Sequence, residues 1–157
     1  PFVSPKLISN IYNEFKKNNL NHDILTPIYL LRDKNIQDPN LVKVVVASNG
    51  DALYFSRSAI PYIRDKPTSE WSRYSKYYGH IGIYGFRANV LAHWREMPSS
   101  PLEKIESLEQ LRFLEGGFRI KTLLSNEEVS SIDTYDDLRE VISKISHSNG
   151  GKTISNN

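Results

Sequence analysis

Hydrophobic residues first recur at helical spacing along the chain. Ser4 and Pro5 are residue types that begin helices, and the apolar residues after them share one arc of an amphipathic helix. The arc consists of Leu7, Ile8, Ile11, Tyr12 and Phe15. The pattern predicts a helix that ends near residues 18–19 and packs on a core through this arc.

Short runs of apolar and aromatic residues then predict strands. Residues 24–31 form one run, in which Pro27 indicates a sheet edge or a bulge because proline has no amide hydrogen. Residues 42–48 and 52–56 flank Asn49-Gly50-Asp51, a sequence typical of a hairpin turn. We therefore expect a hairpin beside a first strand.

Polar segments, strands and helices alternate in the rest of the chain. Residues 65–75 are polar and lack periodicity, which predicts a mobile loop that could act as a lid, and residues 77–87 predict a long strand. Further expected elements are helices at 88–96 and 101–115, a strand at 118–124, and a helix from Asp133 to about Ser146, before a disordered tail at 148–157. Helices between strands predict one layered α/β domain over residues 1–147.

The expected helix at 101–115 has an unusually wide apolar surface. Its apolar residues recur at every third position and span about 240° of the helix circumference. They are Leu102, Ile105, Leu108, Leu111 and Leu114. Such a band predicts burial on two sides and favours a second subunit as one of the two covers. Glu109 falls inside the band, whereas Gln110 falls on the polar arc, so Glu109 either pairs with Arg112 or binds a ligand.

Composition narrows the class of protein. The 157 residues with 39% hydrophobic content suffice for one domain with a core, and 20 Lys and Arg against 18 Asp and Glu leave a net charge of +2, which predicts no nucleic-acid partner. The absence of cysteine excludes disulfides and thiolate chemistry. The apolar runs are too short to span a membrane, so we expect a soluble cytoplasmic protein.

Arg57 and Arg64 flank Pro61 in a mostly apolar segment. Arginine presents a planar fork of donors suited to carboxylate or phosphate, so the two forks could grip one anion from two sides. Alternatively, both are surface residues whose stems cover Tyr54 and Tyr62. The spacing alone does not decide between these interpretations.

His80, Gly82 and Tyr84 fall on one face of the expected strand at 77–87. The missing side chain of Gly82 leaves room for a ligand to bond both neighbours, whereas the alternative is a structural histidine. Asp133 precedes the last expected helix, where an aspartate either caps the helix or supplies an oxygen ligand to Mg²⁺.

Four of these segments occur in the order of a known family. They are SRSAIPY at 56–62, HIGIYGFR at 80–87, SPLEKIESLEQLR at 100–112 and IDTYDDL at 132–138. On these motifs the chain resembles the CMP-Kdo synthetases, also called 3-deoxy-manno-octulosonate cytidylyltransferases, from Pro1 to about Ile142.

This resemblance implies a Rossmann-like α/β nucleotidyltransferase fold, a three-layer sandwich with a mixed sheet. It also implies a homodimer with a dimerisation region at about 88–117. Such enzymes transfer CMP from CTP to the sugar acid Kdo with Mg²⁺, release pyrophosphate, and supply lipopolysaccharide biosynthesis in the cytoplasm.

By motif, the resemblance also assigns residues. Arg57 and Arg64 would hold the carboxylate of the sugar acid and its neighbouring oxygens. His80 and Tyr84 would line the sugar pocket, and Glu109 with Gln110 would bond the sugar hydroxyls. Asp133 would be a magnesium ligand.

The chain departs from the family pattern at its start. The family's loop that cradles the triphosphate, its cytosine-reading residues and its first metal-binding aspartate have no counterpart here. We therefore expect the chain to be the C-terminal portion of a longer enzyme and inactive alone. A cytidylyltransferase for another acidic sugar, such as a sialic-type acid, and a non-catalytic dimerisation fragment remain alternatives.

Overall fold

The structure is a computed structural model that describes residues 3–17, 22–126, 139 and 142. Residues 5–127 form a compact unit, and every described helix and strand named here belongs to it. The helix expected at 133–146 lies outside the described residues apart from Arg139 and Ile142, and the expected tail at 148–157 lies outside them entirely.

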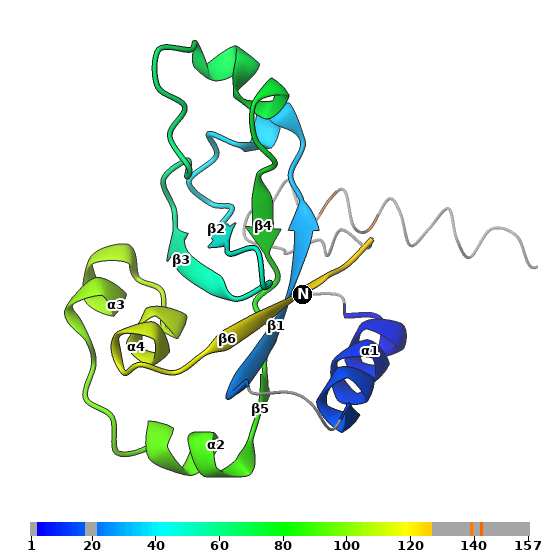
Figure 1. Ribbon diagram of the computed structural model, residues 1–157, viewed down its shortest axis with the longest axis vertical. Helices are drawn as coiled ribbons and strands as arrows, with labels where there is room; N and C mark the ends of the chain where they lie inside the picture. The colour runs from blue at the N-terminus through cyan, green and yellow to red at the C-terminus, as the bar shows by residue number, and fades with distance from the viewer. Residues whose placement is uncertain (1–2, 18–21, 127–138, 140–141, 143–157) are drawn as a thin grey trace, which may run out of the picture. The chain divides into compact units, whose positions relative to one another are not determined.

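A six-stranded mixed sheet forms the centre of the unit (Figure 1). Its strands are β1 (Ile24–Leu30), β2 (Lys43–Val46), β3 (Ala52–Ser56), β4 (Tyr78–His80), β5 (Gly85–Phe86) and β6 (Ile120–Leu124). The order is β3-β2-β4-β1-β5, and β6 pairs with β1. The central strand β1 is antiparallel to β4 and β5 and parallel to β6. The predicted α/β fold with a mixed sheet is therefore confirmed.

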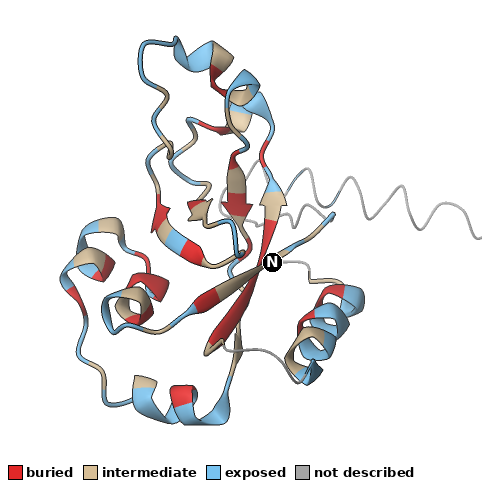
Figure 2. Ribbon diagram, viewed as in Figure 1, coloured by how far each residue is buried: buried red, intermediate tan, exposed pale blue. Residues whose placement is uncertain are grey.

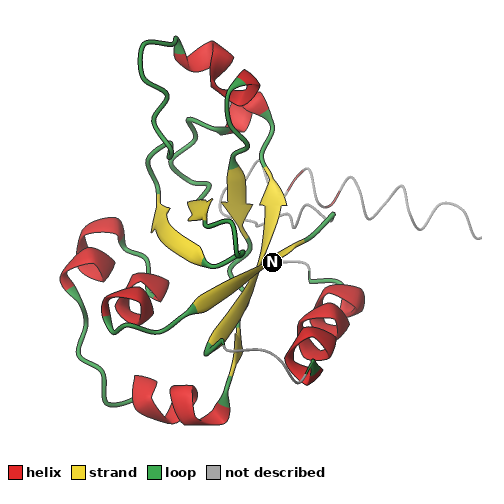
Figure 3. Cartoon of the chain, in the orientation of Figure 1, coloured by secondary structure: helices red, strands yellow, loops and turns green. Residues whose placement is uncertain are grey.

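Helices lie on both sides of this sheet (Figure 3). They are α1 (Pro5–Lys16), α2 (Ala88–Trp94), α3 (Pro101–Glu106) and α4 (Gln110–Glu115), with short 3₁₀ helices η1 (Asp33–Asn35) and η2 (Thr68–Arg73). Helix α1 packs against β1 and β5, whereas α4 packs against β3. Figure 1 shows α1 on one side of β1, and α3 with α4 on the other. Every helix in the described part of the chain is too short or too polar to traverse a membrane.

Helix α1 has the predicted position but buries a narrower stripe than expected. Leu7 and Ile11 are buried, whereas Ile8 and Tyr12 remain 55% and 59% exposed. Figure 2 shows α1 as mostly exposed, with short buried stretches. The helix approaches β5 closely, because a Cβ added at Gly85 would lie 2.2 Å from the ring of Phe15. Glycine in β5 is thus what lets α1 pack onto the sheet.

The predicted hairpin joins β2 to β3 and is confirmed by their antiparallel pairing. Gly50 adopts φ +84° in the turn, a conformation that glycine reaches without steric cost. The hairpin tip also contacts β6, because the carbonyl of Gly50 accepts from the backbone nitrogen of Thr122 at 2.9 Å. The turn therefore links the hairpin to the parallel part of the sheet.

Pro27 does not mark a sheet edge, since β1 has partners on both sides. Its carbonyl accepts from the nitrogen of Ile81 at 3.0 Å. In an extended strand the N–H and C=O of one residue point toward the same neighbouring strand. The position where Pro27 lacks an N–H therefore faces residues 81–84. These residues lie between β4 and β5 and form no strand. A central proline is tolerated here because the ladder is interrupted beside it.

The strand expected at 77–87 is broken into β4 and β5. Between them the chain turns tightly, and the nitrogen of Ile83 bonds the carbonyl of Ile81 at 2.6 Å. The predicted alternation of faces therefore does not run through residues 81–84. The break places His80 and Tyr84 on opposite sides of a bend.

Residues 65–75 are not the irregular loop that their polarity predicts. They contain η2, and Trp71 is 4% exposed, with its indole nitrogen donating to the carbonyl of Lys66 at 3.0 Å. Trp71 also stacks on Tyr77, with ring centroids 6.2 Å apart. One large aromatic residue can anchor a segment that has no hydrophobic periodicity.

The helix expected at 101–115 is two helices, α3 and α4. Ser107 ends α3 in the left-handed conformation at φ 53°. Ile105 is 79% exposed in α3, whereas Leu108 and Leu111 are buried. The continuous apolar band predicted for residues 101–115 was therefore wrong, because one helical wheel does not apply across Ser107.

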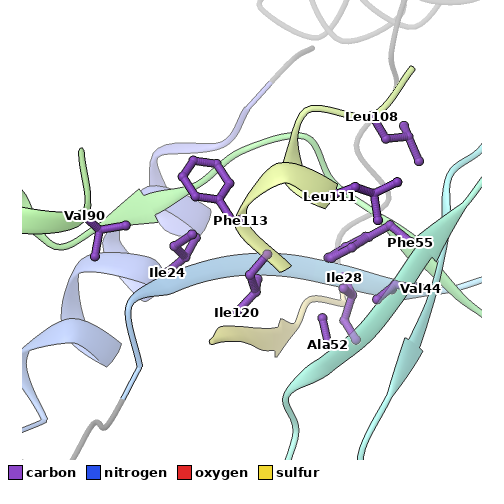
Figure 4. Packing of buried hydrophobic residues seen from close by; sticks show 10 residues of the cluster. All are labelled: Ile24, Ile28, Val44, Ala52, Phe55, Val90, Leu108, Leu111, Phe113 and Ile120. Carbon is purple, nitrogen blue, oxygen red and sulfur yellow. The ribbon is translucent and has the colours of Figure 1, made fainter. Parts of the chain in front are cut away.

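The main core lies between the sheet and the helices that contain Val90 and Leu111 (Figure 4). Its buried members are Ile24, Ile28, Val44, Ala52, Phe55, Val90, Leu108, Leu111, Phe113 and Ile120. A second cluster consists of Leu31, Ile36, Trp71 and Tyr77. The segment that carries the two candidate arginines ends against this second cluster, through Ile63.

Candidate functional site

Four predicted substrate residues come from two neighbouring parts of the fold. His80 ends β4 and Tyr84 lies in the bend after it, with ring centroids 5.3 Å apart. The pKa of Tyr84 is raised by burial and by the charge of Glu109, which is in electrostatic reach of the phenol. Gln110 follows Glu109 as the first residue of α4. The structure therefore brings the bend after β4 and the junction of α3 with α4 together.

Gln110 is buried, not on a polar face as predicted. It is 5% exposed, and its Nε2 atom is buried without a hydrogen-bond partner. A buried donor that lacks a partner costs about 1 to 3 kcal/mol. The fold therefore leaves a donor of Gln110 unpaired.

Glu109 is exposed, so the prediction of a buried carboxylate was wrong. Its proposed pairing with Arg112 is also not what forms, because Arg112 donates to Glu103 through Nε at 2.7 Å and through Nη2. The buried carboxylate of this region is instead Glu103. Glu109 is thus free of the ion pair and lies beside Tyr84.

His80 lies between two aromatic rings. Phe55 meets its ring edge-on with centroids 5.0 Å apart, and Tyr84 lies on another side. Burial lowers the pKa of His80 to about 3, so the imidazole is neutral near pH 7. Its Nε2 atom lies 2.9 Å from the hydroxyl oxygen of Thr26 in β1.

Gly82 leaves the open space that the sequence predicted. A Cβ added to Gly82 would meet no atom within 4 Å, and the residue has no positive φ. Because Gly82 lies in the bend between His80 and Tyr84, a ligand can approach the backbone there. A neutral imidazole and a neutral phenol flank this position, and both can bond hydroxyl groups.

Arg57 follows β3 and is half-buried. Its Nε atom donates to the carbonyl of Glu106 at 3.1 Å, and its Nη1 atom donates to the carbonyl of Pro39 at 3.2 Å. Its backbone nitrogen donates to the carboxylate of Glu106 at 3.0 Å. The guanidinium is therefore oriented by two carbonyls and keeps further N–H groups for an anion.

Lys43 in β2 supports the backbone of Arg57 from inside the fold. Its side chain is fully buried, and Nζ donates to the carbonyls of Asp38 at 2.8 Å, Leu41 at 2.6 Å and Arg57. Burial is the largest effect on Lys43 and lowers its pKa. Three carbonyl acceptors match the three donors of an ammonium group, so Lys43 joins the chain before β2 to the start of the arginine segment.

Arg64 lies in a different environment. Its side chain is 89% exposed, and its Nε atom is 3.3 Å from the carboxylate of Asp65. Among the described residues no contact joins Arg57 to Arg64. The joint grip of one anion by the two arginines therefore stays a prediction.

The predicted magnesium ligand, Asp133, lies outside the described residues. Within residues 3–17 and 22–126, no group of three or more His, Cys, Asp or Glu side chains is arranged to hold a metal ion. The described part of the chain is thus assigned no metal centre.

Sequence reasoning missed Thr26, Lys43 and Glu106, which hold the predicted residues in place. Lys43 carried a signal, because it is a charged residue within the apolar run of residues 42–48. Thr26 and Glu106 carried none, since their roles depend on residues more than 45 positions away.

The mixed sheet has helices on both faces, and a cluster of polar residues lies beside the broken strand. These features define an α/β protein with a candidate polar site. The family model of the cytidylyltransferases matches residues 1–123. This chain belongs to the cytidylyltransferase family.

Curated relatives carry the name 3-deoxy-manno-octulosonate cytidylyltransferase. The protein of Parabacteroides distasonis is 41% identical over 147 residues, which cover 90% of this chain and 58% of the relative. The protein of Elusimicrobium minutum is 43% identical over 141 residues, which cover 89% of this chain and 56% of the relative. The chain therefore spans little more than half the length of these relatives.

A solved structure gives the same picture of the fold. It is the structure of a CMP:2-keto-3-deoxy-manno-octonic acid synthetase complexed with CTP, at a TM-score of 0.82 and 31% identity. The match covers 93% of this chain and 58% of that chain. The predicted nucleotidyltransferase fold is thereby confirmed.

Proposed function

We propose that the protein carrying this chain transfers CMP from CTP to Kdo and releases pyrophosphate. The names of the relatives and the CTP complex of the similar structure support this proposal. In this reaction the anomeric hydroxyl of the sugar acid forms a bond to the α-phosphorus of CTP, the bond from that phosphorus to the bridging oxygen of pyrophosphate breaks, and the hydroxyl loses its proton. Side chains mainly position the reactants in such a transfer.

The observation that supports the proposal most strongly within the site is the unpaired amide of Gln110. A sugar hydroxyl that accepts from Nε2 would complete this buried group. Neutral His80 and Tyr84 suit the other hydroxyls, and the N–H groups that Arg57 retains suit the carboxylate. In the proposal Arg64 contributes to the carboxylate when the sugar acid is bound, and Glu109 accepts from a hydroxyl.

A magnesium requirement is part of the proposal, with Asp133 as a ligand. A bound divalent ion would offset the negative charge of the triphosphate. Since the described residues offer no metal cluster, the test is loss of activity on chelation of divalent ions and its recovery on addition of Mg²⁺, with Asp133→Asn compared with the unsubstituted enzyme.

The proposal also covers the oligomeric state, the cellular location and the use of the product. We infer a homodimer that uses residues 88–117, cytoplasmic location, and a product that supplies lipopolysaccharide biosynthesis. The exposure of Ile105, 79% of its surface, supports an interface in this region.

The experiment is a pyrophosphate-release assay of the full-length protein with CTP, Mg²⁺ and Kdo. We expect release that requires both CTP and Kdo, and a higher kcat/KM for Kdo than for a sialic-type acid. Gln110→Ala should raise the KM for Kdo, whereas Gln37→Ala, at an exposed glutamine outside the site, should leave it unchanged. Faster release with the sialic-type acid would change the assigned substrate, and no release with either acid would favour a non-catalytic module.

A further inference from the structure

Thr26 lies in the central strand β1 with its hydroxyl against three polar atoms. The side chain is fully buried. Its Oγ1 atom lies 2.8 Å from the carbonyl oxygen of Ile83, 3.3 Å from that of Ile81 and 2.9 Å from Nε2 of His80. The strand that supports the site therefore also touches the imidazole.

The number of hydrogens at this junction fixes the direction of each bond. A hydroxyl carries one hydrogen, and carbonyl oxygens can only accept. The short distance to the carbonyl of Ile83 assigns the hydroxyl hydrogen to that bond. Thr26 then has only lone pairs to offer to His80, so Nε2 of His80 must be the donor.

A neutral imidazole carries hydrogen on one nitrogen only. If Nε2 donates to Thr26, Nδ1 has no hydrogen and is an acceptor. Among the described residues, no donor is bonded to Nδ1 of His80. Nδ1 is therefore an acceptor without a partner in the described part of the chain, in a ring whose neighbours include Tyr84.

We propose that Thr26 is a positioning residue that holds His80 as the Nε2–H tautomer, so that Nδ1 accepts a hydrogen bond from a hydroxyl of the sugar acid. The tautomer is inferred from the fold alone, whereas the identity of the ligand rests on the proposed function. The arrangement selects a chemical class, because a carboxylate or phosphate oxygen has no hydrogen to donate and is repelled by the lone pair of Nδ1. His80 is thus a hydroxyl-selective position in the candidate site.

Burial of His80 favours the neutral imidazole that this tautomer requires. The lowered pKa of His80, about 3, keeps the imidazole neutral throughout the neutral pH range. Protonation would turn Nδ1 into a donor and remove the acceptor.

The first test is the tautomer of His80 in the unsubstituted protein, measured by ¹⁵N NMR of histidine side chains. The chain has four histidines, and the spectrum of His80→Asn assigns the signal by its loss. We expect a protonated Nε2 and an unprotonated Nδ1 at neutral pH. A protonated Nδ1 would overturn the proposal and would leave the proposed function untouched.

The second test compares Thr26→Val, which removes the hydroxyl at nearly constant shape, with Thr26→Ser, which retains it. In the full-length enzyme we expect Thr26→Val to raise the KM for Kdo about fivefold to tenfold, as for the loss of one hydrogen bond. The KM for CTP should stay within about twofold, and Thr26→Ser should restore the KM for Kdo. Thr122→Val is the matched control. Thr122 lies in strand β6 and its hydroxyl also donates to a carbonyl, that of Gly50, but it lies outside the site.

The outcomes separate the two proposals. An unchanged KM for Kdo in a folded Thr26→Val enzyme would overturn the role of Thr26. If Thr26→Val does not fold, the tautomer of the unsubstituted protein and the KM of Thr26→Ser still decide the question. Absence of Kdo-dependent turnover by the unsubstituted enzyme would overturn the proposed function, and with it the assignment of the hydroxyl to Kdo.

Discussion

Single residues in and around the site differ in whether the fold provides hydrogen-bond partners for their buried polar groups. Lys43 has three carbonyl acceptors for its ammonium group, whereas the buried Nε2 of Gln110 has none. The first arrangement pairs every donor of the side chain, whereas the second leaves a donor that, in the proposed function, a sugar hydroxyl accepts from.

The two glycines of the broken strand should respond differently to a methyl group. Gly82→Ala should leave the free energy of unfolding unchanged, because a Cβ there meets no atom within 4 Å, yet it should raise the KM for Kdo by occupying the ligand space. Gly79→Ala should lower the free energy of unfolding by about 1 to 3 kcal/mol, because its Cβ would lie 2.5 Å from the ring of Tyr29. Urea denaturation and steady-state kinetics measure both effects. Equal loss of stability in both variants would contradict the open space at Gly82.

Arg57→Lys tests the guanidinium fork. Lysine keeps the charge but cannot bond the carbonyls of Glu106 and Pro39 while also presenting two N–H groups to a carboxylate. We expect the KM for Kdo to rise roughly tenfold, with the KM for CTP little changed. Arg73→Lys, at an exposed arginine in η2, serves as the control. Unchanged kinetics in Arg57→Lys would return Arg57 to the class of surface arginines.

At the scale of elements, the junction of α3 with α4 shapes the site. Ser100 and Glu103 form a capping box that begins α3, and Ser107 ends it. Glu103 then binds Arg112 of α4, which joins the two helices. The α4 start that carries Gln110 is therefore held by an ion pair across the break.

Glu103→Gln should destabilise the protein in a pH-dependent way. The hydrogen bond from Arg112 is the largest effect that lowers the pKa of Glu103 from its ordinary 4.5. Folding thus favours the ionised carboxylate, so its contribution to the free energy of unfolding is full above pH 4.5 and is lost as pH falls through the lowered pKa. We expect a loss of about 2 kcal/mol at pH 7.

Urea denaturation from pH 7 downward measures this difference. The gap between Glu103→Gln and the unsubstituted protein should shrink as the pH falls below 4.5. Glu96→Gln, at an exposed glutamate, should change the free energy of unfolding little at any pH. A gap that stays constant with pH would contradict the assigned ion pair.

Local patterns predicted the elements better than their ends and breaks. The hairpin at Asn49-Gly50-Asp51 was predictable because turn chemistry is local. The breaks at residues 81–84 and at Ser107 were not, since each depends on partners distant in sequence. Residues 65–75 were misjudged because a single buried Trp71 outweighs a polar composition.

Residues of the candidate site were predictable only where their residue type has few structural roles in a strand, as glycine does. A glycine flanked by His80 and Tyr84 indicated an open position, and the structure has open space there. The burial of Gln110 and the exposure of Glu109 reverse the prediction, because both follow from the break in the helix. Residues that act through tertiary contacts, such as Thr26, could not be found before the strands were paired.

At the scale of the whole molecule, the chain has the fold of the cytidylyltransferase family to which it belongs. The chain matches the cytidylyltransferase family model over residues 1–123 but spans little more than half of its curated relatives. In the proposed function, the described residues contribute the sugar-acid side of the site, with an arginine, two neutral rings and a buried amide.

The proposed dimer can be tested at Ile105, the most exposed of the large hydrophobic residues that the structure describes. Ile105 is 79% exposed within the region predicted to dimerise. Ile105→Glu would place a charge in the interface, so we expect a shift from dimer to monomer in light scattering coupled to size-exclusion chromatography. Ile8→Glu is the matched control, because Ile8 is 55% exposed on α1, outside that region. A dimer that persists in Ile105→Glu, or a monomeric unsubstituted protein, would contradict the interface.

A crystal structure of the full-length protein with Kdo and a non-reactive CTP analogue tests the central claim most directly. The account predicts that a hydroxyl of the sugar acid accepts from Nε2 of Gln110, that another lies against Nδ1 of His80, and that Arg57 bonds the carboxylate. A sugar acid bound elsewhere, with the amide of Gln110 still unpaired, would contradict it.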